Sequence, residues 1–246
     1  MRTLLLISIF FTLPFALAAC DAEDGEEDDA GDTSATAGAD AGAEGGDGGD
    51  GGTLFAVGDS VMEWNVDEGQ SIPEVAAQRA GLGVVNAAIS GAMVLDDGEE
   101  GIPRQYQSGD WSWVIVEGGA NDIGPDGCGC GQCIAVVDQL MSSDGNSGAL
   151  VDLLAQIEGD GNRAVLAGYY RVPDNAPEYT DCAEEMDELN ARFQAYASTR
   201  EDVIYVSMGD AMDPGDPSFY AEDLIHPSVK GSQAVGTLIG EAILAP

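Results

Sequence analysis

Short apolar segments alternate with helical segments along most of this chain, and that order restricts the folds open to it. Five apolar segments have the length of buried strands and lie at residues 54–57, 83–88, 112–117, 163–169 and 202–208. Helical patterns lie between and after them, at residues 71–80, 134–141, 147–158, 181–199 and 228–244. Such alternation predicts a parallel sheet with helices on both faces and right-handed crossovers between the strands.

Residues 1–19 have the pattern of a secretory signal peptide. Arg2 precedes an apolar segment at residues 4–17 that is too short for a membrane-spanning helix. The segment ends in small residues directly before Cys20, which resembles the lipobox of bacterial lipoproteins. This resemblance implies cleavage before Cys20 and lipidation of that cysteine. Ordinary signal cleavage nearby, with Cys20 discarded or left as a free thiol, is the alternative.

Residues 21–52 contain only Asp, Glu, Gly, Ala, Ser and Thr. A segment without large apolar side chains cannot bury enough surface to offset the entropy lost on ordering. We therefore expect residues 20–52 to be a disordered acidic tether that begins at the lipidated Cys20 and holds a domain away from a membrane. A specific acidic binding segment is the alternative. Residues 53–246 then form one domain, which is large enough for a core of its own.

The predicted domain carries a large negative charge. The chain as a whole has a net charge of -37, from 45 acidic and 8 basic residues. Twelve acidic residues lie in the tether and one basic residue precedes it, which leaves residues 53–246 near -26. Nucleic acids and polyanionic substrates need a basic surface, so we do not expect them as partners. Adaptation to high salt is another source of such acidity.

Four cysteines, Cys128, Cys130, Cys133 and Cys182, lie in the predicted domain. In an exported chain, an even number of cysteines predicts disulfides, here two. Three pairings are open, and the one that joins Cys128 to Cys130 is the least favourable because a single intervening residue strains the bridge. A zinc site built from the same four residues is the alternative, but an oxidising compartment favours disulfides over a metal site.

Candidate catalytic residues follow four of the five predicted strands. Ser60 follows the first strand in a Gly-Asp-Ser turn, Gly91 lies in a small-residue loop after the second, and Asn121 follows the third. Asp223 and His226 follow the fifth. The carboxyl ends of parallel strands meet at one edge of a sheet, so we expect these residues to lie close together. A serine nucleophile needs a base, and His226 is the only histidine in the sequence.

The motifs at residues 58–60, 91, 119–122 and 223–226 occur in the order found in the SGNH (GDSL-like) hydrolase family, which the chain resembles over residues 53–246. The resemblance implies a flavodoxin-like three-layer α/β/α sandwich with a five-stranded parallel sheet. It also implies hydrolysis of carboxylic esters without a metal or another cofactor. Ser60 would attack the acyl carbon, His226 would accept the serine proton, and Asp223 would orient His226.

The same resemblance implies an oxyanion hole formed by the backbone N–H groups of Ser60 and Gly91 and the side-chain amide of Asn121. Simpler roles are open to each of the three: Ser60 could cap a helix, Gly91 could only form a turn, and Asn121 could only satisfy loop backbone groups. We expect Asp59 and Asp122 to fix loop conformation. Trp64, Trp111 and Trp113 could line a substrate groove, although Trp113 lies within a predicted strand and is expected in the core instead.

The expected substrate is a small-molecule or carbohydrate ester. For an enzyme tethered outside the cytoplasm, removal of acetyl groups from a cell-envelope or environmental polysaccharide is the favoured reaction. A short-chain carboxylesterase or lipase-like enzyme is one alternative, and a catalytically silent carbohydrate-binding lipoprotein is another. Contact with a membrane is expected only through the lipid at Cys20, and the sequence predicts no particular oligomeric state.

Overall fold

The computed structural model describes residues 52–176 and 179–245 of the 246-residue chain. The predicted signal peptide at residues 1–19, the predicted lipidation site Cys20 and the rest of the predicted tether up to residue 51 lie outside the described residues. Within the described residues, no helix has the length and apolar character needed to cross a membrane.

Five parallel strands form one sheet in the order β2-β1-β3-β4-β5. The strands are β1 (Thr53–Val57), β2 (Gly83–Asn86), β3 (Trp113–Val116), β4 (Ala164–Gly168) and β5 (Val203–Ser207). Each overlaps one of the five predicted apolar segments, and all four pairings between these strands are parallel, so none of the five is joined to its neighbour by a hairpin. The prediction of a parallel sheet connected through crossovers is therefore confirmed.

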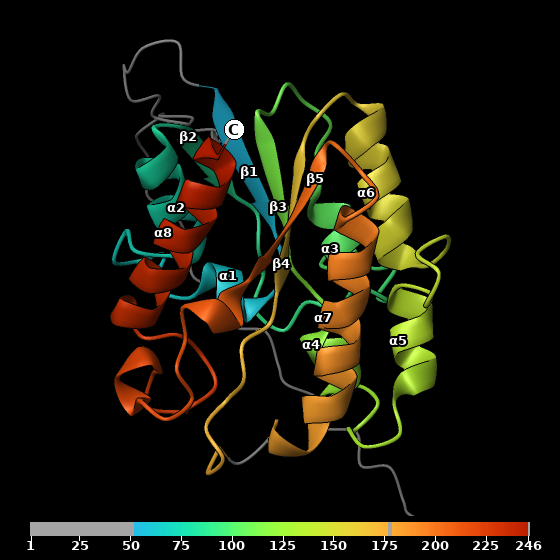
Figure 1. Cartoon of the computed structure of the whole chain (residues 1–246), viewed down its shortest axis with the longest axis vertical. Helices are drawn as coiled ribbons and strands as arrows, with labels where there is room; N and C mark the ends of the chain where they lie inside the picture. Colours follow the sequence, from blue (N-terminus) through green and yellow to red (C-terminus); the bar gives the residue numbers. More distant parts are fainter. Residues whose placement is uncertain (1–51, 177–178, 246) are drawn as a thin grey trace, which may run out of the picture. The chain divides into compact units, whose positions relative to one another are not determined.

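Helices cover both faces of this sheet (Figure 1). The helices are α1 (Ser60–Glu63), α2 (Ile72–Ala80), α3 (Ile102–Gln105), α4 (Ala120–Ile123), α5 (Ile134–Leu140), α6 (Ala149–Gly159), α7 (Ala183–Ala197) and α8 (Val229–Leu244), with short 3-10 turns at Thr180–Cys182, Met208–Asp210 and Pro217–Phe219. Helices α2 and α8 pack against each other on one face, and α6 and α7 lie on the other. The result is the predicted three-layer α/β/α sandwich.

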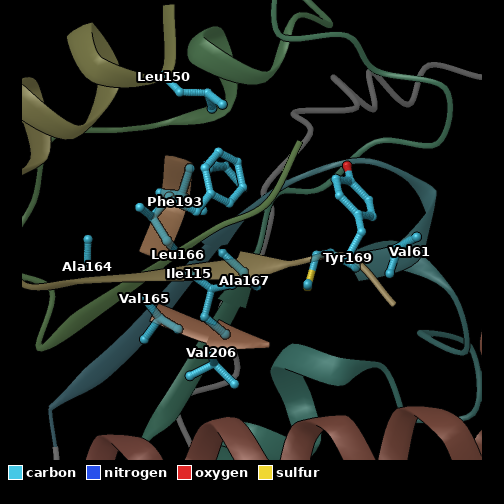
Figure 2. Packing of buried hydrophobic residues seen from close by; sticks show 14 of the residues in the cluster. Val61, Ile115, Leu150, Ala164, Val165, Leu166, Ala167, Tyr169, Phe193 and Val206 are labelled. Carbon is cyan, nitrogen blue, oxygen red and sulfur yellow. The ribbon is translucent and has the colours of Figure 1, made fainter. Parts of the chain in front are cut away.

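The core lies between the sheet and these two helix layers. Figure 2 shows Phe193 of α7 and Leu150 of α6 on one side of the sheet, and Val165 and Val206 on the other. All residues of β3 and β4 are buried, as expected for central strands covered on both faces. Burial of this apolar surface is the main favourable term in the stability of the domain.

Helix α8 approaches α2 closely because it carries glycines on the contacting side. A Cβ atom added to Gly236 would lie 2.8 Å from the backbone oxygen of Ile72, and one added to Gly240 would lie 2.8 Å from that of Ala76. No side chain larger than hydrogen fits at either position without a shift of backbone. The packing matters for the site, because the loop that ends in His226 leads directly into α8.

The prediction that the second strand is buried is wrong. Among the residues that the structure describes, strand β2 forms the edge of the sheet and pairs with β1 alone. Val84 and Val85 are each 37% exposed, although both would suit a buried strand by residue type. Strand order decides this burial, and strand order is not readable from the alternation of apolar and helical segments.

The four cysteines form the disulfides Cys128–Cys133 and Cys130–Cys182. The least favourable pairing, Cys128 with Cys130, is not used. Because the sulfur atoms are joined to one another, they do not form the zinc site considered as an alternative. The second bridge connects the loop after α4 to the turn that begins α7, and both segments border the cavity described below.

Candidate active site

The turn after β1 presents Ser60 as the first residue of α1. Asp59 is the N-cap of this helix, and its Oδ1 accepts a hydrogen bond of 2.9 Å from the backbone N–H of Val61. The alternative that Ser60 itself serves as the cap is therefore wrong. Gly58 is required here, because a Cβ atom at this position would lie 2.6 Å from Oε2 of Glu117. The serine hydroxyl is left free to face the loop that contains His226.

Ser60, His226 and Asp223 form a hydrogen-bonded chain. The Oγ atom of Ser60 lies 2.7 Å from Nε2 of His226, and Nδ1 of the same ring lies 2.7 Å from Oδ2 of Asp223. Oδ1 of Asp223 accepts hydrogen bonds from the backbone N–H groups of Ile225 and His226, at 2.9 and 3.0 Å. Ser60 and His226 are 166 positions apart in the sequence, and the fold brings them together with Asp223, as expected for loops at one edge of a parallel sheet.

The charge state of Asp223 suits a partner for an imidazole. Partial burial opposes ionisation of its carboxyl, but the hydrogen bonds from the His226 ring and from two backbone N–H groups outweigh that effect. The pKa of Asp223 is therefore lowered from its usual value. An ionised Asp223 accepts a hydrogen bond from Nδ1, which leaves Nε2 of His226 as the acceptor for the hydroxyl of Ser60.

Three contacts fix the backbone around His226. The Tyr170 hydroxyl donates to the carbonyl oxygen of Ile225 at 2.7 Å. The backbone N–H of Ala221 donates to the carbonyl oxygen of His226 at 2.8 Å. On the other side, Nδ2 of Asn65 donates to the carbonyl oxygen of Pro227 at 3.1 Å. The imidazole is thus held by a loop that is tied to the end of β4, to itself and to the end of α1.

Gly91 lies in the loop after β2, Asn121 lies in the short helix α4, and the two segments are joined to each other. Gly91 has a φ of +78°, a conformation that favours glycine, and Nδ2 of Asn121 donates to the carbonyl oxygen of Ala92 at 3.0 Å. Ser90 is fixed by Glu63, whose Oε2 accepts from both its backbone N–H and its hydroxyl. Within the described residues, the backbone N–H groups of Ser60 and Gly91 donate to no protein acceptor.

The predicted catalytic and oxyanion-hole residues, with the exception of Asp223, line a single cavity of about 460 Å³. Its lining includes Ser60, His226, Gly91 and Asn121, whereas Asp223 lies behind the imidazole and is absent from the lining. Tyr170, Val172, Tyr179 and Met186 supply much of the apolar wall, while Arg171 and Asp174 supply charged groups. The cavity therefore offers a mostly apolar space with polar groups at one end.

Two of the three tryptophans lie where the sequence predicted. Trp64 lines the cavity, and Trp113 is a buried residue of β3. Trp111 lies outside the cavity lining and packs on Phe55 at a ring-centroid distance of 4.7 Å.

Asp122 accepts hydrogen bonds of 2.9 Å from the backbone N–H groups of Val94 and Leu95, the loop-fixing arrangement expected of it.

Sequence reasoning missed a buried acidic cluster next to the serine turn. Asp59 and Glu117 are 1% and 0% exposed, and the backbone N–H of Asp59 donates to Oε2 of Glu117 at 3.0 Å. The Tyr169 hydroxyl donates to Oδ2 of Asp59 at 2.8 Å and accepts from the backbone N–H of Ala120 at 3.2 Å. In the described part of the chain, Oε1 of Glu117 has no hydrogen-bond partner.

Burial controls the protonation of this cluster. It raises the pKa of Asp59, and it raises the pKa of Glu117 well above its usual value, an effect to which the nearby Asp59 charge adds. The one sequence signal was Glu117, which directly follows the apolar residues 113–116 of a predicted buried strand. Its partner Asp59 lies 58 positions away, and no local pattern connects the two.

Comparisons with known proteins place the chain in a family and show which solved structures share its fold. A family model described as the GDSL-like Lipase/Acylhydrolase family matches residues 56–234. No protein of curated function matches the chain at a significant level. Solved structures do match, at identities that support a shared fold alone.

Three of these solved structures align with most of this chain. A carbohydrate acetylesterase family member from Sinorhizobium meliloti is 14% identical with a TM-score of 0.56, over 78% of this chain and 97% of that one. A GDSL-like lipase from Bacteroides thetaiotaomicron is 18% identical with a TM-score of 0.54, over 78% and 87%. A candidate SGNH hydrolase from Slackia heliotrinireducens is 16% identical with a TM-score of 0.57, over 78% and 98%.

Proposed function

Because the chain belongs to the GDSL-like lipase/acylhydrolase family and is an esterase of the SGNH/GDSL type, we propose that it cleaves carboxylic esters with Ser60, His226 and Asp223. The observation that carries this assignment is the 2.7 Å contact between Ser60 Oγ and His226 Nε2. A serine hydroxyl is a weak nucleophile until a base accepts its proton, and this contact puts a base within reach.

The reaction proceeds in two halves. Ser60 Oγ attacks the acyl carbon while its proton passes to His226 Nε2, and the resulting imidazolium then gives that proton to the departing alcohol oxygen. Water next attacks the acyl-serine, again with His226 as the base, and releases the acid and the free serine. Asp223 keeps Nδ1 protonated throughout and stabilises the imidazolium that forms in each half.

The oxyanion that develops on the acyl oxygen is stabilised by the backbone N–H groups of Ser60 and Gly91 and by Nδ2 of Asn121. The two backbone N–H groups have no protein acceptor among the described residues, so they are available to a substrate. Asn121 has a second amide hydrogen besides the one that it gives to Ala92. Donors of this kind each contribute about 3 kcal/mol of transition-state stabilisation.

The favoured substrate is a neutral acetylated carbohydrate. A domain near -26 disfavours anionic esters, and a carbohydrate acetylester is neutral. The carbohydrate acetylesterase family member from Sinorhizobium meliloti shares the fold. A short-chain carboxylesterase is the second candidate, because Val172 and Met186 in the cavity wall suit an apolar acyl chain. The lipase-like alternative would hydrolyse esters whose acyl chains are longer than acetyl. The silent carbohydrate-binding alternative would hydrolyse no ester at all.

The enzyme acts outside the cytoplasm and is anchored through a lipid on Cys20. Two disulfides support an oxidising compartment, and the small residues before Cys20 support lipoprotein processing. Incorporation of a radiolabelled fatty acid into the chain, and its loss in Cys20→Ala, tests the anchor.

Hydrolysis assays with purified protein and Ser60→Ala test the activity. The panel contains a chromogenic acetate, longer acyl esters and acetylated sugars. Faster turnover of acetylated sugars than of simple esters supports deacetylation, and faster turnover of simple esters supports the carboxylesterase. Equal slow rates from wild type and Ser60→Ala would leave the binding protein as the better account.

A further inference from the structure

Helix α1 consists of a single turn that carries a functional group at each end. Ser60 is its first residue, Trp64 is its C-cap, and the backbone N–H of Trp64 donates to the carbonyl oxygen of Ser60 at 2.9 Å. Residues four apart in a helical turn lie on the same side. The sequence Ser-Val-Met-Glu-Trp therefore presents a hydroxyl and an indole to the same neighbour, which is the imidazole of His226.

The indole of Trp64 lies flat against that imidazole. The ring centroids are 3.9 Å apart and the planes are 4° from parallel. The hydrogen bonds of His226 to Ser60 and Asp223 lie at the ring edge, at Nε2 and Nδ1. Edge contacts alone allow the ring to tilt about the line that joins the two nitrogens, whereas a flat aromatic neighbour opposes that tilt.

We propose that Trp64 is a positioning residue that holds the plane of His226 and stabilises its protonated form during catalysis. This inference rests on the proposed function, in which the proton that leaves Ser60 Oγ is held on Nε2 until it passes to the leaving alcohol. A cation over the face of an indole is attracted by the negative face of the π-system, and indole is the strongest of the aromatic side chains in this respect. The neutral imidazole of the resting enzyme gains less, so the stack favours the transition state.

A second role as a cavity wall makes a different prediction. Trp64 borders the 460 Å³ cavity, so its removal could weaken substrate binding alone. A wall residue would change KM and leave kcat close to wild type, whereas a residue that stabilises the imidazolium changes kcat. The ratio of the two effects therefore separates the roles.

The kinetic experiment compares Trp64→Leu, Trp64→Phe and the matched control Trp111→Leu on a chromogenic acetate. Trp64→Leu keeps an apolar side chain but loses the π face, and we expect kcat to fall roughly 2- to 30-fold with a smaller change in KM. Trp64→Phe restores a face and should recover part of kcat. Trp111 packs against Phe55 outside the cavity, with the ring planes tilted by 33°, so its loss should lower the melting temperature and leave kcat unchanged.

A spectroscopic measurement tests the stack independently of turnover. His226 is the only histidine in the sequence, so protein labelled at histidine gives one set of imidazole NMR signals. In wild type, the ring protons over the indole face are shielded, and in Trp64→Leu they should move downfield. If Ser60→Ala proves fully active, the proposed function fails, and these signals still decide whether Trp64 orients the ring.

Three results would overturn the proposal. They are a wild-type kcat in Trp64→Leu with only KM altered, a Trp64→Phe variant as impaired as Trp64→Leu, and imidazole signals that do not move when the indole is removed.

Discussion

The hydroxyl of Tyr169 lies 2.8 Å from Oδ2 of Asp59 and connects the end of β4 to the turn that presents Ser60. The same oxygen accepts from the backbone N–H of Ala120, so one buried hydroxyl joins the serine turn to the helix that contains Asn121. We expect Tyr169→Phe to lower the free energy of unfolding by about 1–3 kcal/mol, because it leaves a buried donor and a buried acceptor without partners.

Urea denaturation measures this loss. Tyr205→Phe is the control, since its hydroxyl contacts neither Asp59 nor Ala120 and the change should have a smaller effect. A Tyr169→Phe protein as stable as Tyr205→Phe would contradict the linking role of the hydroxyl.

The buried carboxyl of Glu117 predicts a pH-dependent stability. Its pKa is raised well above its usual value of 4.5 by burial, so the folded state holds a proton that the unfolded state releases. The stability associated with that proton is full below about pH 4.5 and declines as the pH rises toward the raised folded pKa. Relative to Glu117→Gln, which keeps an acceptor for Asp59 but does not titrate, wild type should lose up to about 1.4 kcal/mol per pH unit in this window.

Denaturation of both proteins across the pH range gives the difference curve. Glu241 is an exposed glutamate paired with Arg79, and it serves as the control. The free energy of unfolding of Glu241→Gln should change with pH in parallel with that of wild type. A flat difference between wild type and Glu117→Gln above pH 4.5 is the contrary result.

Asp223→Asn should reduce kcat by about two to four orders of magnitude, because an amide opposite Nδ1 favours the wrong tautomer of His226. The pKa of Asp223 is lowered, and the pairing with His226 is therefore complete above the usual aspartate value of 3.8 and is lost only as the pH falls below it. The loss of kcat should accordingly be constant from neutral pH to mildly acidic pH. Asp216→Asn, at an exposed aspartate paired with Lys230, should keep wild-type kcat. Comparable kcat values for the two variants would exclude Asp223 from the mechanism.

The two disulfides should differ in their contribution to stability. Cys130 and Cys182 lie 52 positions apart, whereas Cys128 and Cys133 lie five apart. Loop-closure entropy assigns about 4 kcal/mol to the longer loop and about 2 kcal/mol to the shorter one. Paired alanine replacement of Cys130 and Cys182 should also raise KM, because that bridge joins the segments containing the cavity residues Asp126 and Thr180. Equal stabilities and equal KM values for the two double variants would refute both points.

The sequence was sufficient to predict the strands, the layers and the meeting of Ser60 with His226. Parallel strands explain this success, since loops at their carboxyl ends converge whatever the strand order. The order itself was not readable, and for that reason the exposure of β2 was mispredicted. Helices α1 and α4 have four residues each, too few for a periodic pattern. The contacts of Glu117 and Trp64 depend on distant residues and became visible only in three dimensions.

Covalent labelling with a fluorophosphonate ester tests the central claim most directly, because such reagents phosphonylate a serine only where a neighbouring base activates it. We expect mass spectrometry to find one phosphonyl group per wild-type chain, located on Ser60. Ser60→Ala should take up none, and His226→Ala should react far more slowly because the sequence holds no second histidine. Labelling of another residue, or equal labelling of wild type and Ser60→Ala, would contradict the assignment of Ser60 as the nucleophile.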